Sequence, residues 1–214
     1  MPSSGEPVRP VAVLDACVLI PAALRDLLLS CADVGVFRPV WQEEILNEVK
    51  RNGPRLLVEK NGLTEPAALA AVEYILSKMA DAFPDAIAAS SLWVPLVPDM
   101  TCDLKDRHVL AVAVGTAATH LVTDNTRDFP VASRPHGVAV VKPDRFIRDQ
   151  LASSPDLVVE AVESMSRRLK KPKQSPVQLA ELMTRGHHLP RFGVELRDLL
   201  AELANTGPLL VILW

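Results

Sequence analysis

The chain has 214 residues, of which 49% are hydrophobic and 23% are charged, and its formal net charge is −3. This length fits one medium domain, or one domain with a small appendage, and it buries a substantial core without a disulfide or structural metal. The slight negative charge argues against a protein that holds nucleic acid by bulk electrostatics. It does not argue against a carboxylate site that binds Mg²⁺, because the ion reverses the local charge and attracts phosphate.

Cysteine content and hydropathy favour a cytoplasmic protein. The three cysteines, Cys17, Cys31 and Cys102, show no CxxC spacing, and their odd number suggests reduced thiols. No apolar run approaches the roughly 18 residues of a membrane span. Residues 1–7 lack the charged and apolar regions of a signal peptide. We therefore expect no membrane association.

Apolar runs that alternate with helical patterns predict an α/β fold, in which helices flank a parallel sheet. The predicted strands lie near residues 10–14, 36–40, 119–123 and 137–141. Apolar residues at three- and four-residue spacing predict helices near 21–33, 41–51, 66–82 and 105–117.

The strand pattern stops after Lys142-Pro143. Four further helices are predicted near residues 144–153, 156–170, 176–184 and 193–204. This shift predicts an α/β domain over residues 1–145 and a C-terminal helical extension over 146–214. Two of the extension's helices have apolar faces, so we expect the extension to pack on the first domain or on a second copy of it.

Acidic residues from separate segments are placed to share one cleft. Asp15 follows the apolar run 11–14 and Asp124 follows 121–123, so both fall at the carboxyl ends of predicted strands, where open α/β sheets form their sites. Glu48 lies in a predicted helix, and Asp103 and Asp106 open another. Such hard oxygen ligands suit Mg²⁺ or Mn²⁺. The cluster therefore predicts a metal-dependent nuclease, in which the ion activates water and relieves charge on the leaving oxygen.

Simpler interpretations of the same residues stay open. An Asp after a strand is about as often only a helix N-cap, and Asp103 fits either a cap or an acid that supports the site. His108 is more easily explained as a structural residue, and His187-His188 as solvated loop residues. The basic run 167–173 could contact RNA phosphate. Basic residues at the C-terminal end of a helix also complement the helix dipole, and this second explanation is favoured.

Two arginines follow strand motifs closely enough to reach a substrate phosphate. Arg25 comes after the first predicted strand and Arg127 after the third. A surface salt bridge is an equally good explanation for each.

Four motifs in a fixed order make the chain similar to PIN-domain proteins, and most closely to VapC-like toxin ribonucleases. They are Val-Leu-Asp-Ala-Cys-Val-Leu-Ile around Asp15, Ile-Leu-Asn-Glu-Val around Glu48, Asp-Leu-Lys-Asp-Arg-His-Val-Leu-Ala around Asp106, and Val-Thr-Asp-Asn-Thr-Arg-Asp-Phe-Pro at 122–130. The resemblance runs from about residue 10 to 145, and the last two motifs are its most specific part.

The resemblance implies an α/β nuclease with three or four acidic residues around one or two divalent ions. It implies that Asp15, Glu48 and Asp106 hold Mg²⁺ or Mn²⁺ and that Asn125 is the polar residue beside them. Many relatives have Asp where Asn125 stands, so a second ion would need Asp124 or Asp128 to compensate. Ala16-Cys17 stands where such proteins often have hydroxyl or Asn side chains, which weakens the expected support for Asp15.

The function implied by this resemblance is that of an endoribonuclease toxin, held inactive by a cognate antitoxin and often dimeric. Only nine of the residues are aromatic, so RNA selection would rely on shape more than on base stacking. The alternative is a catalytically silent PIN-like interaction module. A phosphotransfer domain fits less well, because Cys17 stands where a haloacid-dehalogenase type of site needs a second Asp.

Overall fold

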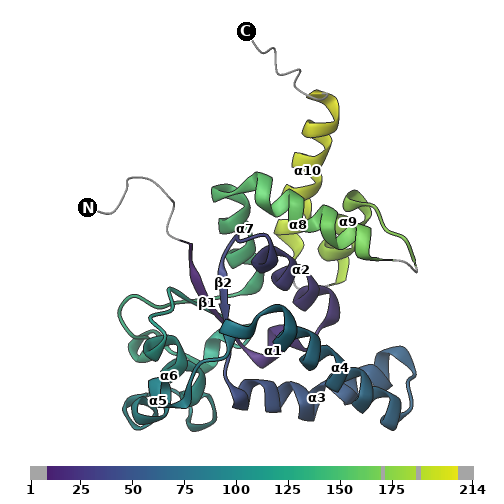
Figure 1. The fold of residues 1–214 in the computed structure, drawn as a ribbon. Helices are drawn as coiled ribbons and strands as arrows, with labels where there is room; N and C mark the ends of the chain where they lie inside the picture. Colours follow the sequence, from purple (N-terminus) through teal and green to yellow (C-terminus); the bar gives the residue numbers. More distant parts are fainter. Residues whose placement is uncertain (1–8, 170–171, 187–188, 207–214) are drawn as a thin grey trace.

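The computed structural model of the protein describes residues 9–169, 172–186 and 189–206. Its N-terminal part is built on a four-stranded sheet in which every neighbouring pair of strands is parallel, in the order β2-β1-β3-β4. The strands are β1 (Val11–Leu14), β2 (Arg38–Val40), β3 (His120–Val122) and β4 (Ala139–Val141). Helices flank this sheet (Figure 1), so the predicted α/β class is confirmed.

The N-terminal part has six α-helices in the described residues. They are α1 (Ala16–Leu19), α2 (Ala22–Asp33), α3 (Glu43–Asn61), α4 (Glu65–Ala82), α5 (Ser90–Trp93) and α6 (Arg107–Gly115). Of these, α2 and α4 match their predicted ranges, and the short α1 and α5 were not predicted. Short 3₁₀ turns lie between these helices, as η1 (Pro84–Ala86), η2 (Val94–Asp99) and η3 (Leu104–Asp106), and between β3 and β4, as η4 (Thr126–Asp128) and η5 (Val131–Ser133). The predicted helix at 105–117 is therefore a 3₁₀ turn followed by a shorter α-helix.

Helix α3 continues past the predicted end at residue 51, so that prediction was wrong. The segment contains Gly53 and Pro54, which usually end a helix. Here α3 packs against α4 so closely that a Cβ on Gly53 would lie 3.1 Å from a methyl carbon of Val72. Tertiary packing thus outweighs the local preference, and the helix ends instead at Gly62, whose φ of 65° is the left-handed conformation that glycine adopts readily.

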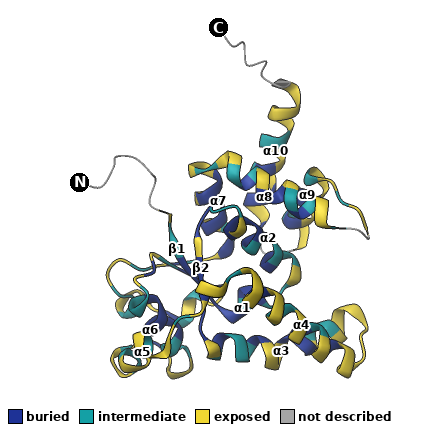
Figure 2. Cartoon of the chain, in the orientation of Figure 1, coloured by how far each residue is buried: buried dark blue, intermediate teal, exposed yellow. Residues whose placement is uncertain are grey.

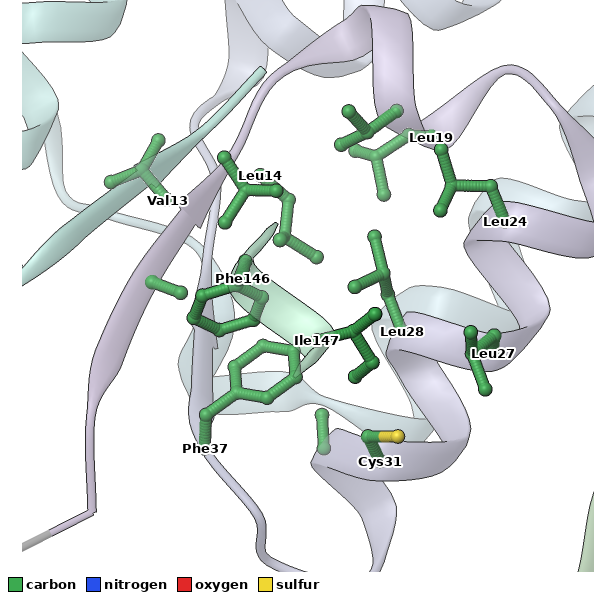
Figure 3. Close-up of a cluster of buried hydrophobic side chains, with 14 of the residues drawn as sticks. Val13, Leu14, Leu19, Leu24, Leu27, Leu28, Cys31, Phe37, Phe146 and Ile147 are labelled. Atoms are coloured by element: carbon green, nitrogen blue, oxygen red, sulfur yellow. The ribbon is translucent and has the colours of Figure 1, made fainter. Parts of the chain in front are cut away.

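The predicted C-terminal helices are present as α7 (Pro143–Ser153), α8 (Pro155–Arg168), α9 (Pro176–Gly186) and α10 (Pro190–Thr206). Helix α8 packs on α2, and the buried face of α7 enters the core beside the sheet. Figure 3 shows Phe146 and Ile147 of α7 among Phe37, Leu28 and other apolar side chains of the N-terminal part. The Phe37 and Phe146 rings meet edge to face with centroids 5.0 Å apart.

Helices α7 and α8 therefore pack on the N-terminal part, as predicted for α8 from its apolar face, whereas α10 packs on α9 and α7 within the extension. Figure 2 shows buried residues on the inward sides of α2, α7 and α8, while much of α10 is exposed. This arrangement leaves the opposite end of the molecule, where α3, α5 and α6 lie in Figure 1, free of the extension.

Two further predictions concern the chain as a whole. Across the described ranges, no helix combines the length and apolar character that a membrane crossing requires. The three cysteines are free thiols, with Cys31 and Cys102 buried and Cys17 partly buried. His187-His188 and part of the basic run 167–173 lie outside the described residues.

Candidate functional site

The site forms where β1 and β3 end side by side. Leu14 pairs with Val122 in the parallel register of these two strands, so the next residues, Asp15 and Thr123, are neighbours at the carboxyl edge of the sheet. The Asp15 backbone N–H donates to the Val122 carbonyl over 3.2 Å, which continues the ladder to that edge. Asp15 therefore lies at the carboxyl end of β1, as predicted.

Protein groups satisfy both carboxylate oxygens of Asp15, which is only 8% exposed. Oδ1 accepts from the Ala16 backbone N–H at 2.7 Å, so Asp15 is the N-cap of α1. Oδ2 accepts from the Thr123 hydroxyl at 2.7 Å and from the Cys17 thiol at 3.2 Å. Hydrogen bonds to a charged acceptor stabilise by about 1.5–3 kcal/mol each, so the carboxylate is held in one orientation.

The same hydrogen-bond network fixes the segment that follows β3. The Asn125 backbone N–H donates to the Thr123 hydroxyl oxygen at 3.0 Å, and the Asp124 N–H donates to the Cys17 sulfur at 3.3 Å. Asn125 is exposed and Asp124 is partly buried. The turn that carries these two residues is therefore anchored to the groups that hold Asp15.

Cys17 supports Asp15 more directly than the sequence suggested. Burial raises the pKa of its thiol from 9.0 to about 12, and the negative charge of Asp15 adds to the increase. The thiol thus keeps its proton at neutral pH and remains a donor to Asp15. The expectation that Ala16-Cys17 weakens the support of this carboxylate was wrong, because the Ala16 backbone and the Cys17 side chain both bind it.

Glu48 reaches the same region from α3. Partial burial raises the pKa of its carboxyl above the ordinary value, and the charge of Asp15 raises it further, while Arg51 and Lys105 oppose the change. A nearby like charge disfavours the ionised form of a carboxyl. Glu48 therefore lies within electrostatic reach of Asp15.

Asp106, the third predicted carboxylate, lies at the junction of η3 and α6. Burial raises the pKa of its carboxyl from 3.8 to about 6; Lys105 opposes the increase, and Asp128 and Asp15 add to it. Its Oδ2 atom is buried and accepts no hydrogen bond from any described residue. A buried acceptor without a donor costs about 1–3 kcal/mol, so this oxygen is a suitable place for a cation.

Lys105 is the residue of this site that the sequence analysis missed. Its Nζ atom lies 3.6 Å from Asp128 Oδ2 and 3.9 Å from Asp106 Oδ2, so it links η3 to η4. The sequence signal was its place between Asp103 and Asp106. Asp103 itself caps η3 by accepting from the Lys105 backbone N–H at 3.2 Å, which supports the capping interpretation, although its charge also raises the pKa of Asp106.

The remaining candidates make ordinary structural contacts. His108 Nδ1 lies 2.5 Å from Gln42 Nε2, and burial lowers the pKa of its imidazole. Arg25 is buried and pairs with Asp26 at 3.0 Å, whereas Arg127 is exposed and has no ion pair within the described ranges. In the basic run, the Arg168 guanidinium donates to the Ser30 hydroxyl on α2. Of the two arginines, Arg127 thus remains a candidate for phosphate contact.

The donor set suits a hard divalent ion, although it is not a closed cage. Over the part of the chain that is described, no three His, Cys, Asp or Glu side chains are grouped closely enough to enclose a metal. Mg²⁺ sites are often completed by water and substrate phosphate around one or two carboxylates. Asp106 Oδ2, buried and without a donor, is the atom that fits such an ion best. Asp15, Glu48 and Asp106 are the residues that would hold it.

A model of the PIN domain matches residues 11–127, which is more than half of the chain. The parallel sheet and the acidic site both fall within this range, and the chain belongs to the PIN-domain family. The predicted family is therefore confirmed.

A second model, described as the VapC50 C-terminal domain, matches residues 143–198 and thus covers most of the C-terminal helices. The chain is 32% identical over 105 residues to a protein of Mycobacterium tuberculosis strain H37Rv that is named "Putative ribonuclease VapC50". That alignment covers 49% of this chain and 61% of the relative. No solved structure matches the chain. The resemblance to VapC-like proteins thus extends beyond the four motifs into the extension.

Proposed function

We propose that this protein is a metal-dependent endoribonuclease that hydrolyses RNA phosphodiester bonds at the acidic site. The observation that carries the proposal is the place of Asp15 at the carboxyl edge of a PIN-domain sheet, where its charge raises the pKa of both the Glu48 and the Asp106 carboxyl. The named ribonuclease among its relatives supports the same activity.

In this proposal the three carboxylates hold Mg²⁺ or Mn²⁺. The ion supplies Lewis acidity, which lowers the pKa of a bound water and offsets charge on the phosphate. Asp15, fixed by Thr123 and Cys17, sets the position of the site, because its carboxylate keeps one orientation before substrate arrives. Asp106 supplies an oxygen that has no protein donor.

The residues around the three carboxylates have supporting roles in the proposal. The Asn125 side chain, on a turn anchored to Thr123, would orient water or a phosphate oxygen. Asp103, Asp124 and Asp128 add negative charge at the edge of the site. No protein nucleophile is needed, since water would attack the phosphorus while the bond to the leaving sugar oxygen breaks and that oxygen takes up a proton.

Cleavage of RNA by the purified protein tests this proposal. We expect cleavage with Mn²⁺ or Mg²⁺, none with chelator, and a loss of at least about 100-fold in Asp15→Asn and in Asp106→Asn, because each removes a charged ligand of the ion. Asp81→Asn is the matched control, since Asp81 is an exposed carboxylate on α4 that pairs with Lys78 at 2.8 Å.

The opposite result would favour the silent interaction module. A folded protein that cleaves no RNA with either ion would overturn the ribonuclease assignment. Asp15→Asn and Asp106→Asn variants that cleave as well as Asp81→Asn would instead overturn the assignment of the site to these carboxylates. His108→Ala is expected to retain cleavage, since His108 contacts Gln42.

The family relationship also leads us to propose a cognate antitoxin as partner and a homodimer as the assembled form. Co-expression with the product of a small neighbouring reading frame tests the first. A stable complex in which RNA cleavage is lost is the expected result, and full cleavage in that complex would contradict it. Light scattering of the purified chain tests the second.

A further inference from the structure

Lys105 brings a positive charge into the acidic site from within the chain. Its ammonium group lies between Asp106 on η3 and Asp128 on η4, at 3.9 and 3.6 Å from their Oδ2 atoms. Turn η3 precedes α6, and turn η4 follows β3. The Lys105 side chain therefore links two turns that are separated in the chain by a helix and a strand. Its charge is also felt at Glu48 on α3.

The contacts of this ammonium are loose. Both distances exceed the 2.7–3.2 Å that is usual for an N–H···O hydrogen bond. The Lys105 side chain is 66% exposed and ends a flexible four-carbon stem. It therefore leaves the carboxylates for water without breaking a short hydrogen bond or entering a less polar environment.

Lys105 lies near the Asp106 carboxylate but does not donate a hydrogen bond to its Oδ2 atom. Asp106 Oδ2 is buried and accepts no hydrogen bond from the described residues, although the ammonium is nearby. A divalent ion binds a carboxylate oxygen at about 2.0–2.1 Å and carries twice the charge, so it interacts far more strongly with this atom than an ammonium at 3.9 Å does. The two cations also repel each other, so each weakens the binding of the other at Asp106.

We propose that Lys105 is a built-in competitor of the metal, which bridges Asp106 and Asp128 when no divalent ion is bound and releases Asp106 when one binds. This inference rests on the proposed function, because it needs a metal at the acidic site. It assigns Lys105 the role of a positioning residue that holds η3 and η4 together in the metal-free protein. It also sets the metal concentration that the site requires.

Mn²⁺ binding by calorimetry tests the proposal without measuring cleavage. Lys105→Met keeps the length of the stem and removes the charge, so the Kd for Mn²⁺ is expected to fall about three- to tenfold, the effect of one nearby charge in a water-like dielectric. Lys105→Arg keeps the charge and is expected to bind Mn²⁺ no more tightly than the wild type. Lys78→Met is the matched control, since Lys78 is 57% exposed and pairs with Asp81 away from the site.

Thermal unfolding supplies a second readout. Without metal, Lys105→Met is expected to unfold at a lower temperature than the wild type, because Asp106 and Asp128 lose their only shared cation within the described residues. Saturating Mn²⁺ is expected to close this gap, since the ion replaces the ammonium. Lys78→Met should shift the midpoint equally with and without Mn²⁺.

The outcomes separate this inference from the proposed function. If the wild type binds Mn²⁺ and Asp15→Asn does not, but Lys105→Met binds with an unchanged or higher Kd, the competitor role is wrong and the metal site stands. If the wild type binds no Mn²⁺, the proposed metal-dependent function fails, and the inference fails with it. If Lys105→Met still unfolds at a lower temperature than the wild type in saturating Mn²⁺, the proposal that the ion replaces the ammonium would also be wrong.

Discussion

Asp15 and Asp106 belong to one acidic site, yet their surroundings differ. Asp15 follows a strand in the middle of the sheet, and the backbone of Ala16, the hydroxyl of Thr123 and the thiol of Cys17 satisfy its oxygens. Asp106 ends a 3₁₀ turn, has one buried oxygen without a donor among the described residues, and faces the exposed Lys105 at 3.9 Å.

This difference divides the site into two halves. In the Asp15 half, protein donors already hold the carboxylate, whereas in the Asp106 half one carboxylate oxygen lacks a donor in the described part of the chain until a cation binds. A carboxylate held by several donors keeps its orientation, so little conformational entropy is lost when a ligand binds to it, which favours binding and catalysis. A carboxylate with a raised pKa and an unpaired oxygen destabilises the metal-free protein, and this cost is recovered when an ion binds. The following predictions measure each half against the other, from the largest expected effect to the smallest.

The strongest test of the Asp15 half is the reactivity of Cys17. Because the pKa of this thiol is raised from 9.0 to about 12, its thiolate fraction near pH 8 is lower than that of an ordinary thiol by about a thousandfold. Alkylation of the native protein, followed at each cysteine by mass spectrometry, is expected to be slower at Cys17 by a similar factor than in the unfolded chain.

Asp15→Asn is the informative variant for this labelling experiment. Removing the negative charge lowers the thiol pKa, so Cys17 should react faster than in the wild type while Cys31, fully buried, does not change. Labelling of native Cys17 at the rate of the unfolded chain would show that Asp15 and Cys17 are not held as the structure has them.

The Asp106 half is tested by the dependence of stability on pH in the presence of chelator. The folded-state pKa of Asp106 is about 6 against an ordinary 3.8, so the folded protein binds this proton more tightly than the unfolded chain does. The favourable contribution is complete below pH 3.8 and is lost as pH rises through about 6, by roughly 2–3 kcal/mol.

Urea denaturation of the wild type and Asp106→Asn at a series of pH values measures this loss. Asp106→Asn lacks the titrating group, so it should be more stable than the wild type near pH 7.5, and this advantage should disappear near pH 4. Mn²⁺ should reduce the advantage at pH 7.5, because only the wild type binds the ion well. A constant difference between the two proteins across this range would contradict the environment assigned to Asp106.

Double-mutant cycles compare the two halves directly. The cycle of Asp15→Asn with Thr123→Val is expected to show a coupling free energy of about 1–3 kcal/mol, because a buried hydroxyl donates to a charged oxygen. The cycle of Asp106→Asn with Lys105→Met should give only about 0–1 kcal/mol, since the ammonium is 66% exposed and its contact is long. Equal couplings in urea denaturation would remove the distinction between the halves.

Local sequence was sufficient for most of the helices and for all four strands. Periodic apolar residues specify α2, α4 and the C-terminal helices, and apolar runs that end in Asp15 and Thr123 specify β1 and β3, because burial on one side of an element leaves a pattern in the chain. The end of α3 was missed, since Gly53 and Pro54 indicate a break that packing against α4 prevents. Short 3₁₀ turns such as η3 leave no comparable pattern.

The candidate carboxylates were also readable from the sequence, because strand ends in a parallel sheet meet at one edge. What the sequence alone determined is therefore the PIN-type fold and the place of Asp15 at its carboxyl edge. Tertiary structure alone decided how each residue is held: Thr123 binds Asp15 only because the β1 and β3 registers align them. Likewise Lys105 meets Asp128 only because η3 and η4, 20 or more residues apart in the chain, are brought together by the turn from α6 into β3. Hydrogen bonds and burial between distant segments set these environments, and local sequence patterns carry no record of them.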